Sequence, residues 1–412
     1  MKLLINKNNF LKSVVVIYII LISGAWSIEI NAYIRLIINT ILGLYSLATL
    51  IKKGQDKKGV NFVLAMTVLL TVSMIINADF VGWRNYVSLI CFICFGLYVY
   101  DEWGIRDFAK RYCNWLCVIS VISLICYVFR DFLYQFSSGL PIVQGHSVSY
   151  INYFIYLYCR EVPYRNCAIF WEPGAFAVFI GIAILFSFSY LDEKSRNRQL
   201  IIYILSLITT GSTLAYTLIL LTMLIYMLQS NKGGSKLWRV LIGVVGLITI
   251  VFILEDIGAL QNINDKLFQG LETNASSRGR YIGQLADLRL IASNPITGVG
   301  TSSYTDRASA AANLLGYYWG VSANTYTSMG AMFGAPLALI SIYGLVRFYY
   351  RKGFLLKVIF IFFGLWIFVT EAFIFKPILY VLIMGGLSSI REDIEYQKQN
   401  EIYKENSLHE SV

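Results

Sequence analysis

The residues that most suggest chemistry surround Glu172, which directly precedes Pro173 and Gly174 at the start of a long apolar run. Proline suits the first turn of a helix, where its missing N–H costs nothing. Glu172 is therefore expected at the helix N-cap, where exposed N–H groups and the helix dipole favour a carboxylate. Arg165 lies seven residues earlier. Two interpretations stay open. Glu172 is only a cap, or it works beside Arg165 at a membrane face, where ionisable groups are functional candidates.

A second group of candidates lies in a polar stretch between two later apolar runs. Three members are arginines, whose planar forks suit paired hydrogen bonds to phosphate: Arg278, Arg280 and Arg289. The alternative for each arginine is a local ion pair with an acidic residue. Apolar residues at helical spacing predict an amphipathic helix here. Asn294 and Pro295 then predict a turn, and Gly298 and Gly300 would let backbone N–H groups approach an anion.

Asn324 stands just before the apolar run that follows this stretch. Its side chain suits either a helix cap or a contact to a substrate. We therefore include it among the candidate binding residues.

The composition indicates a membrane protein. Of 412 residues, 57% are hydrophobic and 14% are charged, whereas a soluble domain carries about 25% charged residues. The apolar residues come in long runs, and a helix needs about 20 mainly apolar residues to cross a bilayer. The net charge of +10 does not indicate nucleic acid as a partner, because most basic residues fall in short loops between apolar runs.

The runs predict an all-α polytopic protein with about twelve transmembrane helices. The expected crossings are 13–30, 32–51, 60–76, 86–100, 112–129, 169–190, 200–210, 213–229, 239–254, 326–346, 358–370 and 376–390. The positive-inside rule places both termini in the cytoplasm, together with the basic flanks of the 200–229 stretch. An interruption at 209–213 makes that stretch a tight hairpin or a re-entrant pair.

This topology divides the chain into successive parts, with two long segments outside the cytoplasm. They are N-terminal transmembrane helices at 1–129, a first long extracytoplasmic loop at 130–168, central transmembrane helices at 169–254, a large extracytoplasmic loop at 255–325 between the ninth and tenth helices, C-terminal transmembrane helices at 326–390, and a cytoplasmic tail at 391–412.

The order of these motifs resembles a known family. The matching segments are Phe170-Trp171-Glu172-Pro173-Gly174, then Thr210-Gly211-Ser212-Thr213, Ser277-Arg278, and Asn294-Pro295-x-x-Gly298-x-Gly300. They are similar to the O-antigen and capsular polysaccharide polymerases (Wzy-type) and to the related O-antigen ligases, over roughly residues 160–390. Ligases of this superfamily typically carry a histidine just before the asparagine that opens the helix after the large loop. Here that position is Ala323, which favours a polymerase.

The resemblance implies a helical, GT-C-like membrane glycosyltransferase. The expected substrate is an oligosaccharide repeat unit linked to undecaprenyl diphosphate, which the enzyme would join into O-antigen, capsule or exopolysaccharide chains. Glu172, Arg165 and Arg278 would be catalytic, and the substrate-binding residues would be Arg280, Arg289, Asn324, Gly298 and Gly300. Glu172 would accept the proton of the acceptor hydroxyl or position Arg165. No cofactor or metal is expected, because the outer carboxylates form no ligand cluster and arginines take the place of the cation.

The expected location is the bacterial cytoplasmic membrane, with the active site facing the periplasm or exterior. Besides the bilayer, the expected partners are a chain-length regulator and a flippase of the same pathway. Two alternatives stay open. One is a ligase-type transferase that moves finished glycan to another acceptor. The other is a precursor flippase or transporter, which would suit twelve helices and the intramembrane Arg35, although the sequence shows no repeated halves of the kind usual in transporters.

Overall fold

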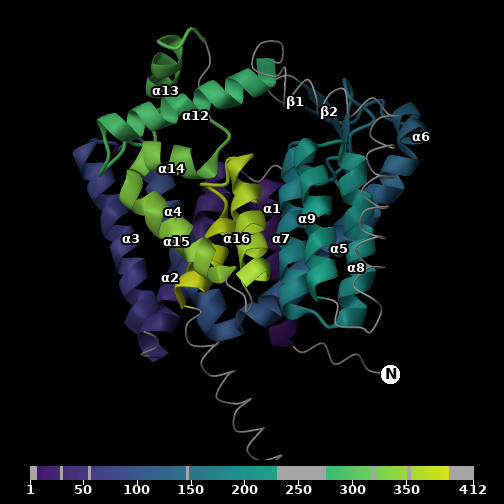
Figure 1. The fold of residues 1–412 in the computed structure, drawn as a ribbon, viewed down its shortest axis with the longest axis horizontal. Coiled ribbons are helices and arrows are strands. Elements are labelled where there is room, and N and C mark those ends of the chain that lie inside the picture. Colours follow the sequence, from purple (N-terminus) through teal and green to yellow (C-terminus); the bar gives the residue numbers. More distant parts are fainter. Residues whose placement is uncertain are drawn as a thin grey trace, which may run out of the picture.

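The computed structural model describes residues 7–27, 31–53, 57–144, 148–229, 275–317, 322–349 and 354–388. The predicted ninth crossing at 239–254, the first part of the large loop and the tail at 391–412 lie outside the described residues. The described chain is mostly helical (Figure 1).

Most of the helices overlap the predicted apolar runs, although the ends of several differ by six or seven residues. They are α1 (Lys7–Gly24), α2 (Ala32–Lys53), α3 (Lys57–Ile76), α4 (Trp83–Tyr98), η1 (Val99–Trp103), α5 (Ile105–Val128), α6 (Arg130–Gln135), α7 (Pro173–Tyr190), α8 (Glu193–Thr210), α9 (Thr213–Gln229), α12 (Ala275–Ser293), α13 (Tyr304–Asn313), α14 (Thr325–Phe333), α15 (Ala335–Phe348), α16 (Phe354–Val369) and α17 (Pro377–Ser388).

Within the described ranges, five helical segments are long and apolar enough to cross a membrane: α2, α3, α4 continued through η1, α5 and α7. These candidate spans indicate an integral membrane protein. Several shorter apolar helices accompany them, including α9, α16 and α17. The structure therefore supports multiple crossings, but it does not show the predicted count of about twelve.

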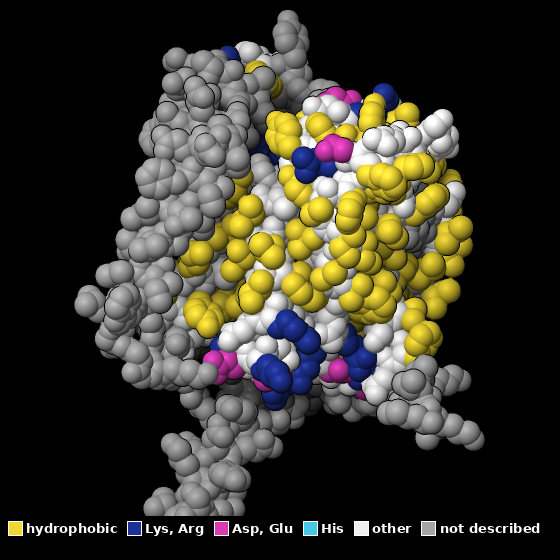
Figure 2. Space-filling view, turned by 90° about the vertical axis from the view of Figure 1, so that its right-hand side faces the viewer, with side chains coloured by type: hydrophobic (Ala, Val, Ile, Leu, Met, Phe, Trp, Pro, Cys, Tyr) yellow, Lys and Arg dark blue, Asp and Glu magenta, His cyan; other side chains and the backbone are white. Residues whose placement is uncertain are grey.

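Large apolar side chains cover the outer surface of the bundle, as expected for a protein whose solvent is lipid. Examples on α5 and α8 are Val118, Val121, Ile125, Ile201, Leu205 and Ile208. Figure 2 shows these faces as a broad apolar belt, with lysines and arginines gathered below it. The centre of the bundle is α7, whose residues from Ala175 to Phe188 are buried against α5, α8, α9 and α16.

The first long loop corrects the all-α expectation. It contains a small antiparallel sheet with the order β1-β2-β3, made of β1 (Ile142–Gln144), β2 (Ser149–Asn152) and β3 (Leu157–Cys159). In its register Ile151 lies opposite Ile142 on one side and Tyr158 on the other. The strands are short and lie at the same end of the bundle as α12 and α13 (Figure 1).

The predicted tenth crossing, 326–346, is also corrected, because it is two helices rather than one. α14 ends and α15 begins at Gly334, whose φ of 93° is accessible to glycine and costly for other residues. A Cβ at Gly334 would lie 2.0 Å from the Ile296 carbonyl oxygen. The turn after α12 therefore packs directly against the break, and the backbone N–H groups of Val299 and Gly300 donate to the last carbonyls of α14.

The 200–229 stretch is a tight hairpin, as one of the two sequence interpretations expected. Gly211 ends α8 with φ 58°, and α9 starts two residues later. The left-handed conformation of a glycine at this position is a common helix stop. Both arms are helical along their length, with 18 residues in α8 and 17 in α9.

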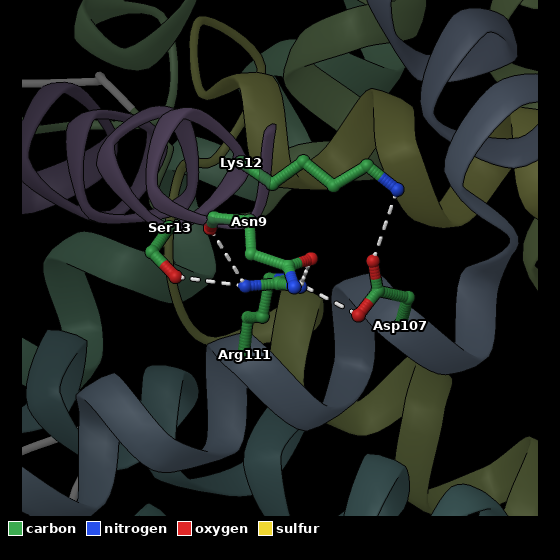
Figure 3. Close-up of polar contacts among 5 residues, drawn as sticks. All are labelled: Asn9, Lys12, Ser13, Asp107 and Arg111. Atoms are coloured by element: carbon green, nitrogen blue, oxygen red, sulfur yellow. Dashed lines mark hydrogen bonds and ion pairs between the residues drawn. The ribbon is translucent and has the colours of Figure 1, made fainter. Parts of the chain in front are cut away.

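At the end of the bundle that carries the N-terminus, a polar network joins α1 to α5 (Figure 3). Asp107 accepts a hydrogen bond from Lys12 Nζ at 3.1 Å and another from Arg111 Nε at 3.1 Å. Arg111 also donates to the Asn9 carbonyl oxygen and to Ser13 Oγ, each at 2.9 Å. This network fixes the register of α1 against α5 and lies far along the bundle from the residues discussed next.

Candidate functional site

The candidate site lies at the opposite end of the bundle, where α12 runs across the helix ends (Figure 1). Four segments meet there: the start of α7, the turn between α8 and α9, the first part of α12, and the connection from α16 to α17. Each contributes side chains that the sequence separates widely.

Glu172 occupies the N-cap position of α7, as predicted. Its backbone is extended, with φ −162° and ψ 162°, and Pro173 is the first helical residue. The side chain does not cap the helix, however, since it accepts no hydrogen bond from the first turn. Its Oε1 accepts one from the Trp171 indole N–H at 3.3 Å. The carboxylate is half-buried and directed away from the capping role, so the cap interpretation explains its position but not its side chain.

Glu371, in the connection between α16 and α17, is the carboxyl that faces Glu172. It is only 4% exposed, and the Glu172 carboxyl lies close enough to affect its titration. Burial and the adjacent Glu172 raise the pKa of Glu371 well above its ordinary value, against the opposing effect of Arg280 and Arg165. Glu371 therefore binds a proton more tightly than an ordinary carboxyl does.

Gly174 makes room for this pair. A Cβ at that position would lie 2.5 Å from Glu371 Oε1, which is closer than any real side chain can approach. The glycine that follows Pro173 therefore has a specific role in bringing the α16–α17 connection against the start of α7.

Two of the predicted arginines flank the carboxyl pair. Arg280 Nη2 lies 3.9 Å from Glu371 Oε1, and its Nη1 donates to the Thr370 carbonyl oxygen at 3.3 Å. Arg165 Nε donates to the Thr210 carbonyl oxygen at 3.1 Å, at the α8–α9 turn. Arg165 and Glu172, both described, form no direct ion pair. The sequence option in which Glu172 positions Arg165 therefore has no contact to support it, while both arginines lower the pKa of Glu371.

Arg278 and Arg289 lie elsewhere on α12. The Arg278 guanidinium stacks over the Tyr317 ring at 5.8 Å, and Arg289 is exposed. Residues two apart on a helix point about 200° apart around its axis. Arg278 and Arg280 therefore lie on different sides of α12, and only Arg280 meets the carboxyl pair.

Gly298 and Gly300 belong to a loop that does present N–H groups to an anion, but the anion is a side chain of the same protein. Asp79, between α3 and α4, accepts hydrogen bonds from the backbone N–H groups of Thr301 and Ser302 and from the Tyr86 hydroxyl. Burial alone would raise the pKa of Asp79, but hydrogen bonds from Ser302 and Thr301 outweigh it and leave that pKa below its ordinary value.

Both glycines are required by close packing in this loop. A Cβ at Gly298 would lie 2.4 Å from the Met332 backbone carbon, and one at Gly300 would lie 2.8 Å from Asp79 Oδ2. Their φ values are 64° and 79°. We infer that the loop is an internal brace between α3, α4 and α14, whose anion position Asp79 already fills.

Asn324 caps α14, the structural alternative that the sequence left open. Its side-chain oxygen accepts from the N–H groups of Tyr326 at 2.9 Å and Thr327 at 3.3 Å. The next residue, Thr325, ties α14 to the site, because its hydroxyl donates to the Glu371 carbonyl oxygen and accepts from the Phe373 N–H.

Asp287 is a second acidic residue that the sequence analysis missed. It is fully buried on α12 and accepts from the hydroxyls of Tyr304 at 2.8 Å, Thr327 at 2.8 Å and Ser328 at 2.9 Å. Burial raises its pKa from 3.8 to about 6, although these hydroxyls partly oppose the shift. Asp287 is seven residues after Arg280, so the two side chains share one face of α12.

A sequence signal existed for Glu371, since it is the only acidic residue between the apolar runs 358–370 and 376–390. For Asp287 the signal was weaker. It lies inside a predicted amphipathic helix, where an acidic residue is ordinary on the polar face. In both cases the residue becomes a site candidate only because of the side chains that the fold brings next to it.

The arrangement suits proton transfer next to a bound anion. A pair of neighbouring carboxyls can take up or release a proton, and guanidinium groups beside it can stabilise negative charge. Among the described residues, no group of three or more His, Cys, Asp or Glu side chains could hold a metal ion. No family model, curated protein or solved structure matches this chain.

Proposed function

We propose that this protein is a membrane glycosyltransferase that polymerises oligosaccharide repeat units carried on undecaprenyl diphosphate. The observation that carries the proposal is the neighbouring carboxyls of Glu172 and Glu371, flanked by Arg280 and Arg165 at one end of an apolar helix bundle. The family resemblance of the segment around Glu172 supports it independently. The products would be O-antigen, capsule or exopolysaccharide chains.

In the proposed reaction, the hydroxyl oxygen of the acceptor sugar forms a bond to the anomeric carbon of the donor. The bond from that carbon to the diphosphate oxygen breaks, and the diphosphate leaves with the electron pair. The hydroxyl proton passes to Glu172, the less buried member of the pair. Because diphosphate is a good leaving group, the protein mainly positions the reactants and stabilises charge.

Glu371 would act through Glu172. Protonated Glu371 would donate a hydrogen bond to Glu172. This hydrogen bond would keep the Glu172 side chain away from the α7 N–H groups and open to the acceptor. Arg280 would hold Glu371 from the other side. Arg165, which has no carboxylate within ion-pair distance among the described residues, remains available to the negative charge of the leaving group.

The proposed topology puts both termini in the cytoplasm and the carboxyl pair on the periplasmic or external face of the cytoplasmic membrane. The placement of lysines and arginines in the sequence supports this orientation. So does the clustering of basic side chains at the end of the bundle away from α12 (Figure 2). On this face the site would meet lipid-linked repeats after a flippase delivers them.

A transporter is the second candidate, because a carboxyl pair that shares a proton also suits proton-coupled transport. Substrate sites of secondary transporters lie near the middle of the membrane, between broken helices of two repeated halves. The pair Glu172 and Glu371 instead lies at helix ends, one at an N-cap and one in a connection. This position favours the transferase.

The test is a Glu172→Gln variant of the purified protein, supplied with lipid-linked repeats. Glutamine keeps the size and the contact to Trp171 but cannot take a proton, so chain growth should fall about a hundredfold or more. Ser302→Ala is the matched control, since it removes a hydroxyl from the Asp79 brace at the same end of the bundle. The control should retain polymer formation, and the abundance of each variant in the membrane is measured alongside.

A further inference from the structure

Lys376 is a cation that the proposed reaction has not used, and it lies beside the site. It stands in the same connection as Glu371, just before α17, and is partly buried. Its Nζ lies over the Trp171 ring, 4.7 Å from the ring centroid. The Trp171 indole N–H donates to Glu172, so one aromatic side chain contacts both the lysine and the candidate base.

A second cation approaches Lys376 from α2. Arg35 is in the first turn of that helix, at the end of the bundle where the carboxyl pair lies, rather than at mid-membrane. Burial and the nearby Arg35 lower the pKa of Lys376 from 10.5 to about 8. Within the described residues, neither side chain forms an ion pair with a carboxylate.

A purely structural role, without a ligand, explains the position of Lys376 only in part. A lysine over a tryptophan ring is stabilised by the cation–π contact, which accounts for the place of Lys376 above Trp171. It does not account for the second cation nearby, since like charges repel each other and Lys376 is partly buried. An anion bound between them would remove that repulsion.

The other two cations at the site each have a polar partner within the protein. Arg280 contacts Glu371 and the Thr370 carbonyl oxygen, and Arg165 donates to the Thr210 carbonyl oxygen. Among the described residues, the side chains of Lys376 and Arg35 have no hydrogen-bond or ion-pair partner. Lys376 contacts the Trp171 ring, whose indole N–H donates to Glu172, so this lysine lies beside the candidate base.

We propose that Lys376 and Arg35 form an anion-binding subsite for the diphosphate of the polyprenyl-linked donor. This inference rests on the proposed function for the identity of the anion. A lysine suits the position because it acts as a point charge over Trp171, and the fork of Arg35 adds directional contacts. The charge of the subsite would hold the leaving group next to Glu172.

Binding of farnesyl diphosphate to the purified, detergent-solubilised protein tests this subsite without requiring turnover. Lys376→Gln and Arg35→Gln should each weaken binding about tenfold or more, the usual effect of losing a charge-assisted contact, and Lys376→Arg should keep most of it. Arg84→Gln is the matched control, because Arg84 is an exposed cation that stacks over Tyr33 at 5.0 Å. The control should bind like the wild type. Equal binding by Lys376→Gln and wild type would overturn the proposal.

Two further measurements separate the alternatives. Wild-type affinity should fall as pH rises through about 8, because Lys376 then loses its charge, whereas the Lys376→Arg variant should not show this fall. If Lys376→Gln loses phosphatidylglycerol binding but keeps the diphosphate, the subsite is a headgroup site and the proposal is wrong. Thermal melting of each variant shows whether it is folded. If Lys376→Gln is unfolded, the binding affinity of Arg35→Gln becomes the test of the subsite.

The outcomes also distinguish this inference from the proposed function. If wild type binds farnesyl diphosphate through Lys376 but never extends lipid-linked repeats, the polymerase proposal fails and the subsite stands. If wild type makes polymer and Lys376→Gln binds and polymerises equally well, the subsite fails and the polymerase proposal stands.

Discussion

Arg278 and Arg280 are two residues apart on α12, so their side chains point to different sides of the helix and have different partners. Arg280 contacts Glu371 and Thr370, whereas Arg278 stacks over Tyr317. Lysine can replace a cation over a ring but cannot reproduce a forked contact. We therefore expect Arg280→Lys to lower polymer formation roughly tenfold to a hundredfold, and Arg278→Lys to change it little. The measurement is polymer yield at matched protein abundance.

The reverse ranking of these two variants would contradict the site as described. A large loss from Arg278→Lys would return Arg278 to the catalytic role that the sequence suggested, through contacts made with substrate only. Equal, small losses from both variants would remove α12 from the active site.

At this scale the N-cap position of Glu172 could be predicted because its signal is local: a carboxylate before proline and glycine. The sequence could not predict Glu371, which lies about two hundred positions away and is joined to Glu172 only by folding. For Gly298 and Gly300, the sequence correctly suggested a loop that accepts an anion. It could not show that the Asp79 carboxylate occupies the anion position of this loop, because Asp79 is far from both glycines in the sequence.

Among the elements, α14 links the two halves of the site. Through Thr325 it holds the connection that carries Glu371, and through Thr327 and Ser328 it holds Asp287 of α12. Asp287 shares a face of α12 with Arg280. The hydrogen bonds of Asp287 therefore hold the face of α12 that carries Arg280 against α14.

Asp287 predicts a specific pH dependence of stability. Its pKa is raised from 3.8 to about 6 in the folded protein, so the folded state binds the proton more tightly than the unfolded state. The stability contributed by that proton is full below the unfolded value and is lost as pH rises to about 6. Asp287→Asn should remove this part of the pH dependence. The melting temperature of the purified protein across that range is the measurement.

Asp287→Ala provides the contrast. It leaves the hydroxyls of Tyr304, Thr327 and Ser328 without their acceptor, which should cost about 1–3 kcal/mol at any pH. An Asp287→Asn variant with the same pH slope as wild type would show that another group titrates in this range.

The extents of most helices followed from the apolar runs, but the break at Gly334 did not. The sequence around Gly334 and Pro336 is apolar on both sides, so it is compatible with one crossing. The break is set by the turn after α12, which packs against Gly334 and donates to the carbonyls of α14. The small sheet in the first long loop was missed because its strands have only 3 or 4 residues.

The molecule as a whole is predicted to place α12 and α13 outside the cytoplasm. A cysteine at Thr305, which is exposed on α13, should react with an impermeant thiol reagent in cells whose outer wall is permeabilised, and one at Ser195 on α8 should not. Detergent should then expose Ser195→Cys to the reagent. The unsubstituted chain is the control, since its cysteines are buried or only partly exposed. Labelling at Ser195→Cys alone would invert the topology.

The most direct test of the central claim is a single reaction with purified wild-type protein in a bilayer and lipid-linked repeat units as the only substrate. The polymerase proposal predicts a ladder of longer lipid-linked chains, and it predicts that Glu172→Gln gives no ladder at equal abundance. No chain growth by wild type until a second acceptor is added would identify a ligase. Movement of intact repeats across the bilayer without any new glycosidic bond would identify a transporter. Either result would contradict the proposal.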